Sequence, residues 1–206
     1  PFTPCNVGVH INWSKHMNAQ FGKPFKSVAF FTDDRKVRGE TVISEKGLEG
    51  SGIYEITRDL RQNHDLRIDL LPDWSIEKVA DALSKSKDKA SQSNFWRKTL
   101  KLGSEKQALL NEFGRSFPKA ARNLATIIKS LRVRHKGLHP FEEAISTRGG
   151  VPFDAIDDTL MLKCMPSIFC AGEMLDWEAP TGSYLISAAL ETGQWAGVKA
   201  INFLKQ

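Results

Sequence analysis

The sequence lacks several features that would assign it to a special class of protein. It has only three cysteines, Cys5, Cys164 and Cys170, and this odd number without regular spacing argues against a disulfide framework and favours a reducing, cytoplasmic location. It has no run of about 18 apolar residues, so we expect no membrane span and no membrane partner. Its 206 residues, 41% hydrophobic and 26% charged, are typical of an ordinary globular protein.

A metal site is also not expected. His135 and His139 have an H-x3-H spacing, which can supply half of a zinc site, but no cysteine follows at a distance that matches a common zinc pattern. Pro140 disfavours a helix that would place both imidazoles on one face. We therefore predict no metal ligands, and no general acid or base stands out as a catalytic residue.

Glycine motifs that hold phosphates are missing as well. The chain contains neither G-x-G-x-x-G nor G-x-x-x-x-G-K-[ST], the patterns that cradle the phosphates of dinucleotides and nucleoside triphosphates. It begins at Pro1 rather than Met, and no signal segment follows.

What is present is an uneven distribution of charge. Residues 76–135 hold 14 basic and 5 acidic side chains, whereas residues 136–206 hold 5 basic and 9 acidic ones. A basic segment of this kind can contact nucleic acid or an acidic partner. Its lysines are scattered rather than clustered, so a solvated helical surface is the favoured interpretation and nucleic acid is not the expected partner.

The hydrophobic pattern changes twice along the chain. Short β-branched and aromatic runs at 24–45 and 66–70 predict strands. From 73 to 129 the apolar residues recur at helical spacing, with Ser75 as an N-cap, and after 130 alternation returns at 131–135 and 143–147. We predict a β-rich part, 1–72 continued by 130–148, into which a helical module, 73–129, is inserted.

The last sixty residues carry the strongest functional signal. The apolar run Ile168–Ala171 predicts a buried strand that ends at Gly172 and Glu173, a place where a carboxylate can accept hydrogen bonds from ribose or ribityl hydroxyls. Thr181 is a suitable N-cap for a long apolar helix over 185–204, and the N–H groups at such a helix start attract negative charge.

These pieces occur in an order that resembles the C-terminal end of the HI0933-like (YhiN/BaiN-like) FAD-containing flavoproteins. Proteins of that family have Thr-x-Gly-Gly-Val, then Ala-Gly-Glu-x-Leu-Asp, then Pro-Thr-Gly-Gly-Tyr. The corresponding stretches here are 147–151, 171–176 and 180–184. Ser183 departs from the pattern, because the family usually has a second glycine there.

The resemblance implies an α+β fold. It consists of a β-barrel-like insert domain with a small inserted helical module, followed by residues 149–206 as the C-terminal strand–helix part of an FAD/NAD(P)-binding domain. In this fold Gly149 and Gly150 would line the flavin ring, Gly172 would let the cofactor approach, and Glu173 would hold its ribityl or pyrophosphate region. Asp176 would be a second polar contact or only a loop cap.

The remaining implied contacts lie at the start of the last helix. Thr181 would cap it, and Gly182, Ser183 and Tyr184 would offer backbone N–H groups to the N1/O2 edge of the flavin. The implied activity is that of an FAD-dependent oxidoreductase with hydride transfer at N5, an open substrate, and NAD(P)H as a candidate reductant. The alternative is a non-enzymatic module that contacts nucleic acid or an acidic partner through 76–135.

Because the G-x-G-x-x-G half of the family is not seen, we expect the chain to start within a longer protein and to hold only the insert and the C-terminal part. On its own it would bind FAD weakly or not at all. Its partner would then be the missing N-terminal half. Without that half we expect the apolar helix to drive formation of a homodimer.

Overall fold

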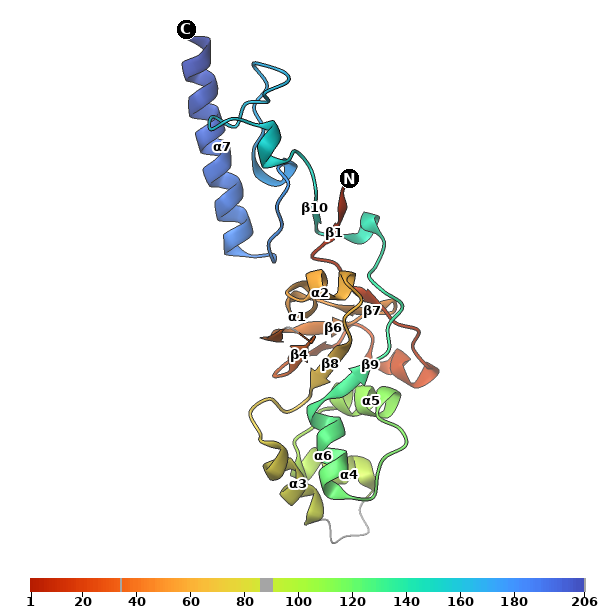
Figure 1. Cartoon of the computed structure of the whole chain (residues 1–206). Helices are drawn as coiled ribbons and strands as arrows, with labels where there is room; N and C mark the ends of the chain where they lie inside the picture. Colours follow the sequence, from red (N-terminus) through yellow and green to blue (C-terminus); the bar gives the residue numbers. More distant parts are fainter. Residues whose placement is uncertain (34, 86–90, 206) are drawn as a thin grey trace. The chain divides into compact units, whose positions relative to one another are not determined.

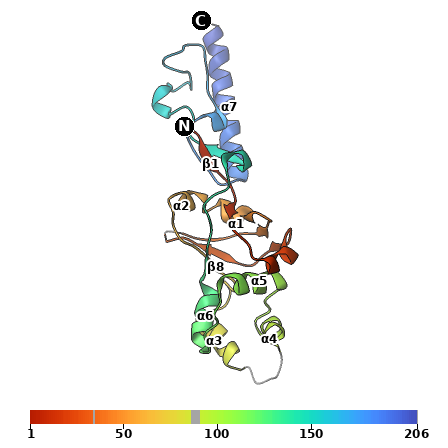
Figure 2. The ribbon, with the colours of Figure 1, turned by 90° about the vertical axis from the view of Figure 1, so that its right-hand side faces the viewer.

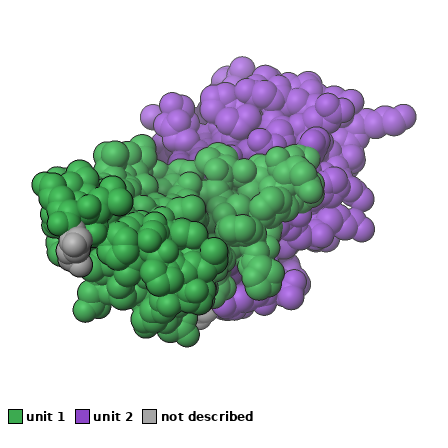
Figure 3. All heavy atoms as spheres, turned by 90° about the horizontal axis from the view of Figure 1, so that it is seen from above, with its two compact units in different colours: residues 1–7, 140–206 green, residues 8–139 purple. Residues whose placement is uncertain are grey.

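The computed structural model describes residues 1–33, 35–85 and 91–205. The chain divides into two units, shown in separate colours in Figure 3. Unit 1 comprises residues 1–7 and 140–206, and unit 2 comprises residues 8–139. Unit 2 begins and ends at neighbouring points, because the His139 N–H donates to the Gly8 carbonyl at 2.8 Å. It is therefore an insertion between two segments of unit 1.

Unit 2 is built on two antiparallel four-stranded sheets, with strand orders β2-β7-β6-β3 and β5-β4-β8-β9. Figure 1 labels β6 and β7 of the first sheet and β4, β8 and β9 of the second. The alternating pattern at 66–69 and 131–133 explains β8 and β9, whose inward residues are buried and whose arginines are exposed. The strands are β2 Val9–His10, β3 Pro24–Phe25, β4 Ala29–Phe31, β5 Lys36–Arg38, β6 Thr41–Ile43, β7 Gly47–Glu49, β8 Leu66–Asp69 and β9 Leu131–Val133.

The prediction of a barrel-like insert is wrong, because in the described residues these strands form open sheets. A barrel needs a closed ring of paired strands. Here β3 pairs with β6 in one sheet, whereas β4 pairs with β5 and β8 in the other. Between β3 and β4 the backbone turns at Ser27, which has a left-handed φ of 53°. The two consecutive strands therefore belong to different sheets.

Four longer helices lie between β8 and β9 in the chain. They are labelled α3 to α6 in Figure 2. Ser75 is confirmed as an N-cap, since its hydroxyl accepts the Lys78 N–H at 3.1 Å. The helices are α3 Ile76–Ser84, α4 Gln92–Thr99, α5 Ser104–Phe113 and α6 Ala121–Lys129, and two short helices, α1 Ser51–Tyr54 and α2 Thr57–Arg61, precede β8.

One hydrophobic core joins the sheets and helices of unit 2. Phe30 from β4 and Ile68 from β8 are fully buried, and Trp96 from α4 packs edge-on against Phe117 with ring centroids 5.1 Å apart. Ile128 from α6 is in the same cluster. Since helices and strands share this core, the helical residues and the β-rich residues of unit 2 are one folded body.

A buried ion pair links the end of β8 to α6. Asp69 is 1% exposed and accepts from Lys129 Nζ at 2.7 Å, while its other oxygen accepts the Leu71 N–H at 3.0 Å. Lys129 Nζ also donates to the Leu71 carbonyl at 2.6 Å. Both charges are thus compensated by ionic and polar partners, as buried charges require.

Unit 1 contains little regular structure before its last helix. β1 (Thr3–Cys5) pairs with β10 (Ser146–Arg148), and α7 (Ser183–Leu204) ends the unit. The strand expected at 143–147 begins at Ser146, because Phe141–Glu143 forms a 3-10 helix. Two further 3-10 helices cover Phe153–Ala155 and Gly172–Met174.

The prediction of a buried strand over Ile168–Ala171 is also wrong. The segment forms one bridge, between Met161 and Phe169, and Ile168 is 41% exposed. A strand needs neighbouring strands to pair its backbone groups, and among the described residues this run has a single bridging partner.

The helix α7 carries apolar side chains that the described residues leave exposed. Its exposed large apolar residues are Tyr184, Ile186, Leu190, Trp195, Val198, Ile201 and Leu204. In contrast, Ala196 is buried. Among the described helices, none combines the length and apolar character of a membrane span.

We expect Lys129→Met to lower the free energy of unfolding by about 3–5 kcal/mol, because it leaves the buried Asp69 carboxylate without its counter-ion. The matched control is Lys26→Met, since Lys26 pairs with Glu40 at 2.8 Å but both side chains are more than 60% exposed. That change should cost about 1 kcal/mol or less. Urea unfolding measures both, and equal losses would contradict the assignment of the effect to burial.

Candidate functional site

Asn6 organises the polar part of unit 1. It is completely buried, and its Nδ2 donates to Ser146 Oγ at 2.5 Å and to the Ala179 carbonyl at 2.7 Å. Its Oδ1 accepts the Thr181 N–H at 2.9 Å. One amide thus fixes the strand β10 and the loop that leads into α7 against the first residues of unit 1.

The stretch that contains Gly149 and Gly150 lies along the 3-10 helix Gly172–Met174. Val151 donates its N–H to the Met174 carbonyl, and Asp176 donates to the Val151 carbonyl, both at 2.8 Å. Gly150, at a φ of 131°, lies so close to this segment that a Cβ would be 2.4 Å from the Met174 carbonyl oxygen. The chain therefore requires a glycine at 150 for its own packing.

Gly149 is equally constrained, since a Cβ there would be 2.4 Å from the Pro1 carbonyl oxygen and its φ is 100°. The absence of side chains at 149 and 150 is thus explained by contacts within unit 1.

Gly172 is held against the middle of α7. Its N–H donates to Thr192 Oγ1 at 2.9 Å, and its carbonyl accepts the Trp177 indole N–H at 2.7 Å. A Cβ at 172 would meet Ala189 Cβ only at an ordinary 3.7 Å. The two hydrogen bonds fix the backbone that presents the exposed Glu173 carboxylate.

The start of α7 has more open space than the surroundings of Gly149, Gly150 and Gly172. Gly182 has a φ of 139°, and the space where its Cβ would lie contains no atom of the described residues within 4 Å. It is the N-cap residue, without a side-chain hydrogen bond, so the expectation that Thr181 caps this helix is wrong. The Thr181 backbone is instead held by Asn6, which places it one residue before the cap.

The electrostatics of this end favour an electron-rich group. The first N–H groups of a helix have no acceptor within the helix, and the dipole of a 22-residue helix places partial positive charge there. No acidic residue lies in the first turn of α7. Ser183 and Tyr184, both exposed, therefore begin a helix whose N-terminal charge is not offset by a side chain of that turn.

The predicted residues thus form two groups along α7. Gly182, Ser183 and Tyr184 lie at its start, whereas Gly172 is bonded to Thr192, nine residues after Ser183 and so roughly 13 Å further along the axis. Glu173 and Asp176 are exposed beside Gly172. Only an elongated ligand could contact both groups.

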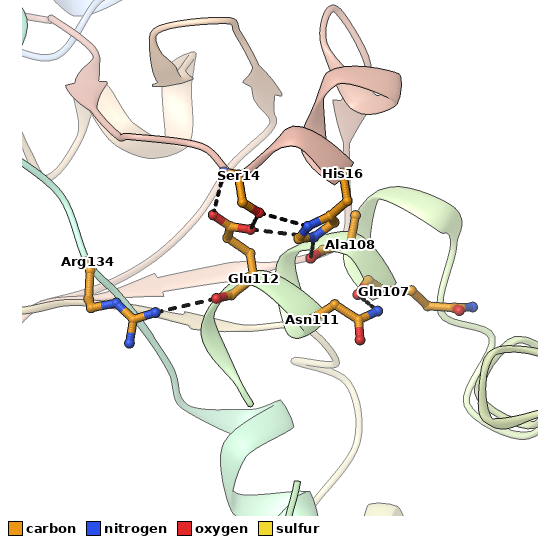
Figure 4. Close-up of polar contacts among 7 residues, drawn as sticks. All are labelled: Ser14, His16, Gln107, Ala108, Asn111, Glu112 and Arg134. Carbon is orange, nitrogen blue, oxygen red and sulfur yellow. Dashed lines mark hydrogen bonds and ion pairs between the residues drawn. The ribbon is translucent and has the colours of Figure 1, made fainter. Parts of the chain in front are cut away.

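A second polar cluster lies in unit 2, where Ser14, His16 and Glu112 meet (Figure 4). It resembles a hydrolytic triad only in composition. Ser14 Oγ donates its proton to Glu112 Oε2 at 2.5 Å and also contacts His16 Nδ1 at 2.8 Å, while His16 Nε2 lies 3.3 Å from the Ala108 carbonyl oxygen. Since a general base must instead accept the serine proton, this cluster is a link between the 3-10 helix Lys15–Gln20 and α5.

The basic segment 76–135 is partly engaged within unit 2, although its residues 86–90 lie outside the described residues. Lys106 donates from Nζ to the carbonyls of Ser27 and Leu70, at 2.8 and 3.0 Å, and its burial lowers the pKa of the ammonium group. Lys129 is bound to Asp69. At least these two cations are therefore not part of a solvated binding surface.

No group of three or more potential metal ligands occurs among the residues that the structure describes. A family model described as the HI0933-like protein Rossmann domain matches residues 8–199 of the chain. The match covers all of unit 2 and residues 140–199 of unit 1, including the glycine-containing stretches and most of α7.

We expect Asn6→Gly to destabilise unit 1 by about 2–4 kcal/mol, because it removes three side-chain hydrogen bonds, two of them to the buried residues Ser146 and Ala179. Glycine accepts the left-handed φ of 49° at this position, so backbone strain does not contribute. Asn63→Gly is the matched control, since Asn63 has a φ of 63° but is exposed. Amide hydrogen exchange at Thr181 should accelerate only in the Asn6 variant, and unchanged protection would contradict the role of Asn6.

Proposed function

Because the chain belongs to the HI0933-like family, we propose that it forms the flavin-facing C-terminal part of an FAD-dependent oxidoreductase. The observation that carries the proposal is the start of α7. There a positive-φ glycine with open space precedes uncapped helical N–H groups, and Asn6 fixes the loop that delivers them.

The described residues fit FAD. The space at Gly182 allows a planar ring to approach the backbone, and the partial positive charge of the helix start favours the electron-rich N1/O2 edge of a flavin. FAD is elongated, which agrees with the separation along α7 between this glycine and Glu173. When bound, FAD would supply hydride transfer at N5.

In this proposal the predicted site residues bind or orient the cofactor. The N–H groups of Ser183 and Tyr184 orient the pyrimidine edge, and Glu173 accepts hydrogen bonds from ribityl or ribose hydroxyls. Gly149 and Gly150 maintain the tight path of the loop beside the cofactor, with Asp176 as a further polar contact. NAD(P)H is the proposed electron donor, and the substrate is left open.

The proposal requires a partner for the pyrophosphate, since the chain has no G-x-G-x-x-G motif. We propose a polypeptide segment that carries this motif, packed on the exposed apolar side chains of α7. Burial of these residues would contribute roughly 25 cal/mol for each Å² of apolar surface. Without that segment, the same residues would pair with a second copy of the chain.

The chain alone should bind FAD weakly or not at all, whereas a complex with the G-x-G-x-x-G half of a HI0933-like protein should retain it. In the complex, Gly182→Ala should weaken FAD binding about tenfold, because its Cβ would occupy the open space through which the ring approaches the backbone. Equilibrium dialysis against FAD measures both effects.

Gly197→Ala is the control, since Gly197 also has no atom within 4 Å of its Cβ position but lies inside α7. It should leave FAD affinity unchanged. Stoichiometric FAD in the purified chain alone would overturn the need for a partner segment, and equal affinities in the two glycine variants would overturn the role of the α7 start.

We expect light scattering of the chain alone to show dimers at high concentration, and Leu190→Glu to shift them toward monomers, because Leu190 is 69% exposed on α7. Gln194→Glu adds the same charge at an exposed polar position of that helix and should have a smaller effect. A strict monomer at every concentration would contradict self-association through α7.

A further inference from the structure

Unit 2 contains a pair of cavities that the flavin proposal does not use. The larger, of about 540 Å³, is lined by Asp65, Phe113, Arg132, Val133, Arg134 and His135. The smaller, of about 200 Å³, shares Phe113, Arg134 and His135 with it and adds Asn12, Glu112 and Lys136. Their common wall is formed by the end of α5 and the residues that continue β9. The larger volume is in the range of small-molecule sites.

β9 and the residues that continue it supply three cations to the lining of the two cavities. Arg132, Arg134 and Lys136 are all exposed, whereas Val133 is buried and His135 is half-buried. Arg132 and Arg134 line the larger cavity, and the consecutive residues Arg134, His135 and Lys136 line the smaller one. Two carboxylates, those of Asp65 and Glu112, also belong to the lining.

Both carboxylates are already engaged. Asp65 accepts from Arg132 Nη2 at 3.0 Å, and the Glu112 carboxylate accepts from the N–H and the hydroxyl of Ser14, at 3.0 and 2.5 Å. These bonds neutralise Arg132 in part but do not involve Arg134 or Lys136. The charge that remains for a ligand is positive.

Arg134 is positioned but not saturated. Its Nη2 donates to the Glu112 backbone carbonyl at 3.4 Å, a long bond that is visible in Figure 4. A guanidinium has five N–H donors, arranged to bind two oxygens of an anion at once. Its central carbon also lies 5.9 Å from the centre of the Phe113 ring, so the guanidinium and the ring are neighbouring flat groups.

His135 adds a hydrogen-bond donor, its Nε2–H group. The Gly137 N–H donates to His135 Nδ1 at 3.2 Å, so in the neutral ring the proton is on Nε2. Burial lowers the pKa of His135, and the nearby Asp65 opposes this only in part. The ring is therefore a neutral N–H donor and a flat surface at physiological pH.

From these observations we infer that the larger cavity binds a nucleoside phosphate, with Arg134 and the His135 Nε2–H on the phosphate and Phe113 beside the base. The cationic wall alone would bind any small anion, but the ring of Phe113, the imidazole and the flat guanidinium also favour a planar ring. The ligand is either a free mononucleotide or the nucleotide end of a dinucleotide. This inference does not rest on the flavin proposal.

Isothermal titration calorimetry of the chain with AMP tests the site, with adenosine and inorganic phosphate as separate ligands. We expect AMP to bind at least tenfold more tightly than either, because each lacks one of the two recognised groups. NADP+ serves as the dinucleotide: binding tighter than AMP would identify the dinucleotide source, and weaker binding a free mononucleotide. Equal binding of AMP and inorganic phosphate would overturn the inference.

Three variants locate the binding. Arg134→Gln should weaken AMP at least tenfold, and Phe113→Leu should weaken AMP while leaving phosphate unchanged. Arg122→Gln is the control, because Arg122 is an exposed arginine of α6 that pairs with Glu77 at 3.5 Å and lines neither cavity. Circular dichroism checks that each variant is folded. Wild-type affinity in a folded Arg134→Gln variant would contradict the assignment.

Discussion

The arrangement of unit 1 depends on one buried amide. Asn6 lies in the first seven residues, yet its three side-chain partners are at 146, 179 and 181. These bonds determine where the chain leaves the irregular region and where α7 begins. Every role proposed for Gly182, Ser183 and Tyr184 therefore depends on a residue remote from them in sequence. A single polar side chain can do this because unsatisfied partners in a buried position would be costly.

The two units differ in how their apolar residues are covered. Unit 2 buries a continuous core that includes Phe25, Phe30 and Trp96, whereas the buried cluster of unit 1 comprises Ile156, Cys170 and Leu175 with a few half-buried neighbours. Unit 1 also contains α7, whose apolar residues are exposed. The small core of unit 1 and the exposed apolar residues of α7 are the observations on which the proposed polypeptide partner rests.

Local signals predicted the helices of unit 2 well. The Ser75 cap and the apolar spacing of α6 depend on neighbouring residues alone, so they can be recognised from a short window. The predictions of a strand at 168–171 and of a β-barrel-like insert were wrong because both depend on which strands pair, and pairing is decided by residues far apart. The predicted N-cap of α7, Thr181, was wrong by one residue, since the Thr181 N–H donates to Asn6 and the helix begins after Gly182. No local sequence pattern predicted the role of Asn6, because its hydrogen-bond partners lie 140 or more residues away in the sequence.

The hydrogen bond between His139 and Gly8 has a consequence for the evolution of this fold. The two ends of unit 2 lie side by side, so its entry and exit are a single junction in unit 1. A segment joined in this way can be gained, lost or exchanged as a cassette, with little change to the backbone that receives it. Exchange of residues 8–139 would then change the ligands or partners of unit 2 while α7 is retained.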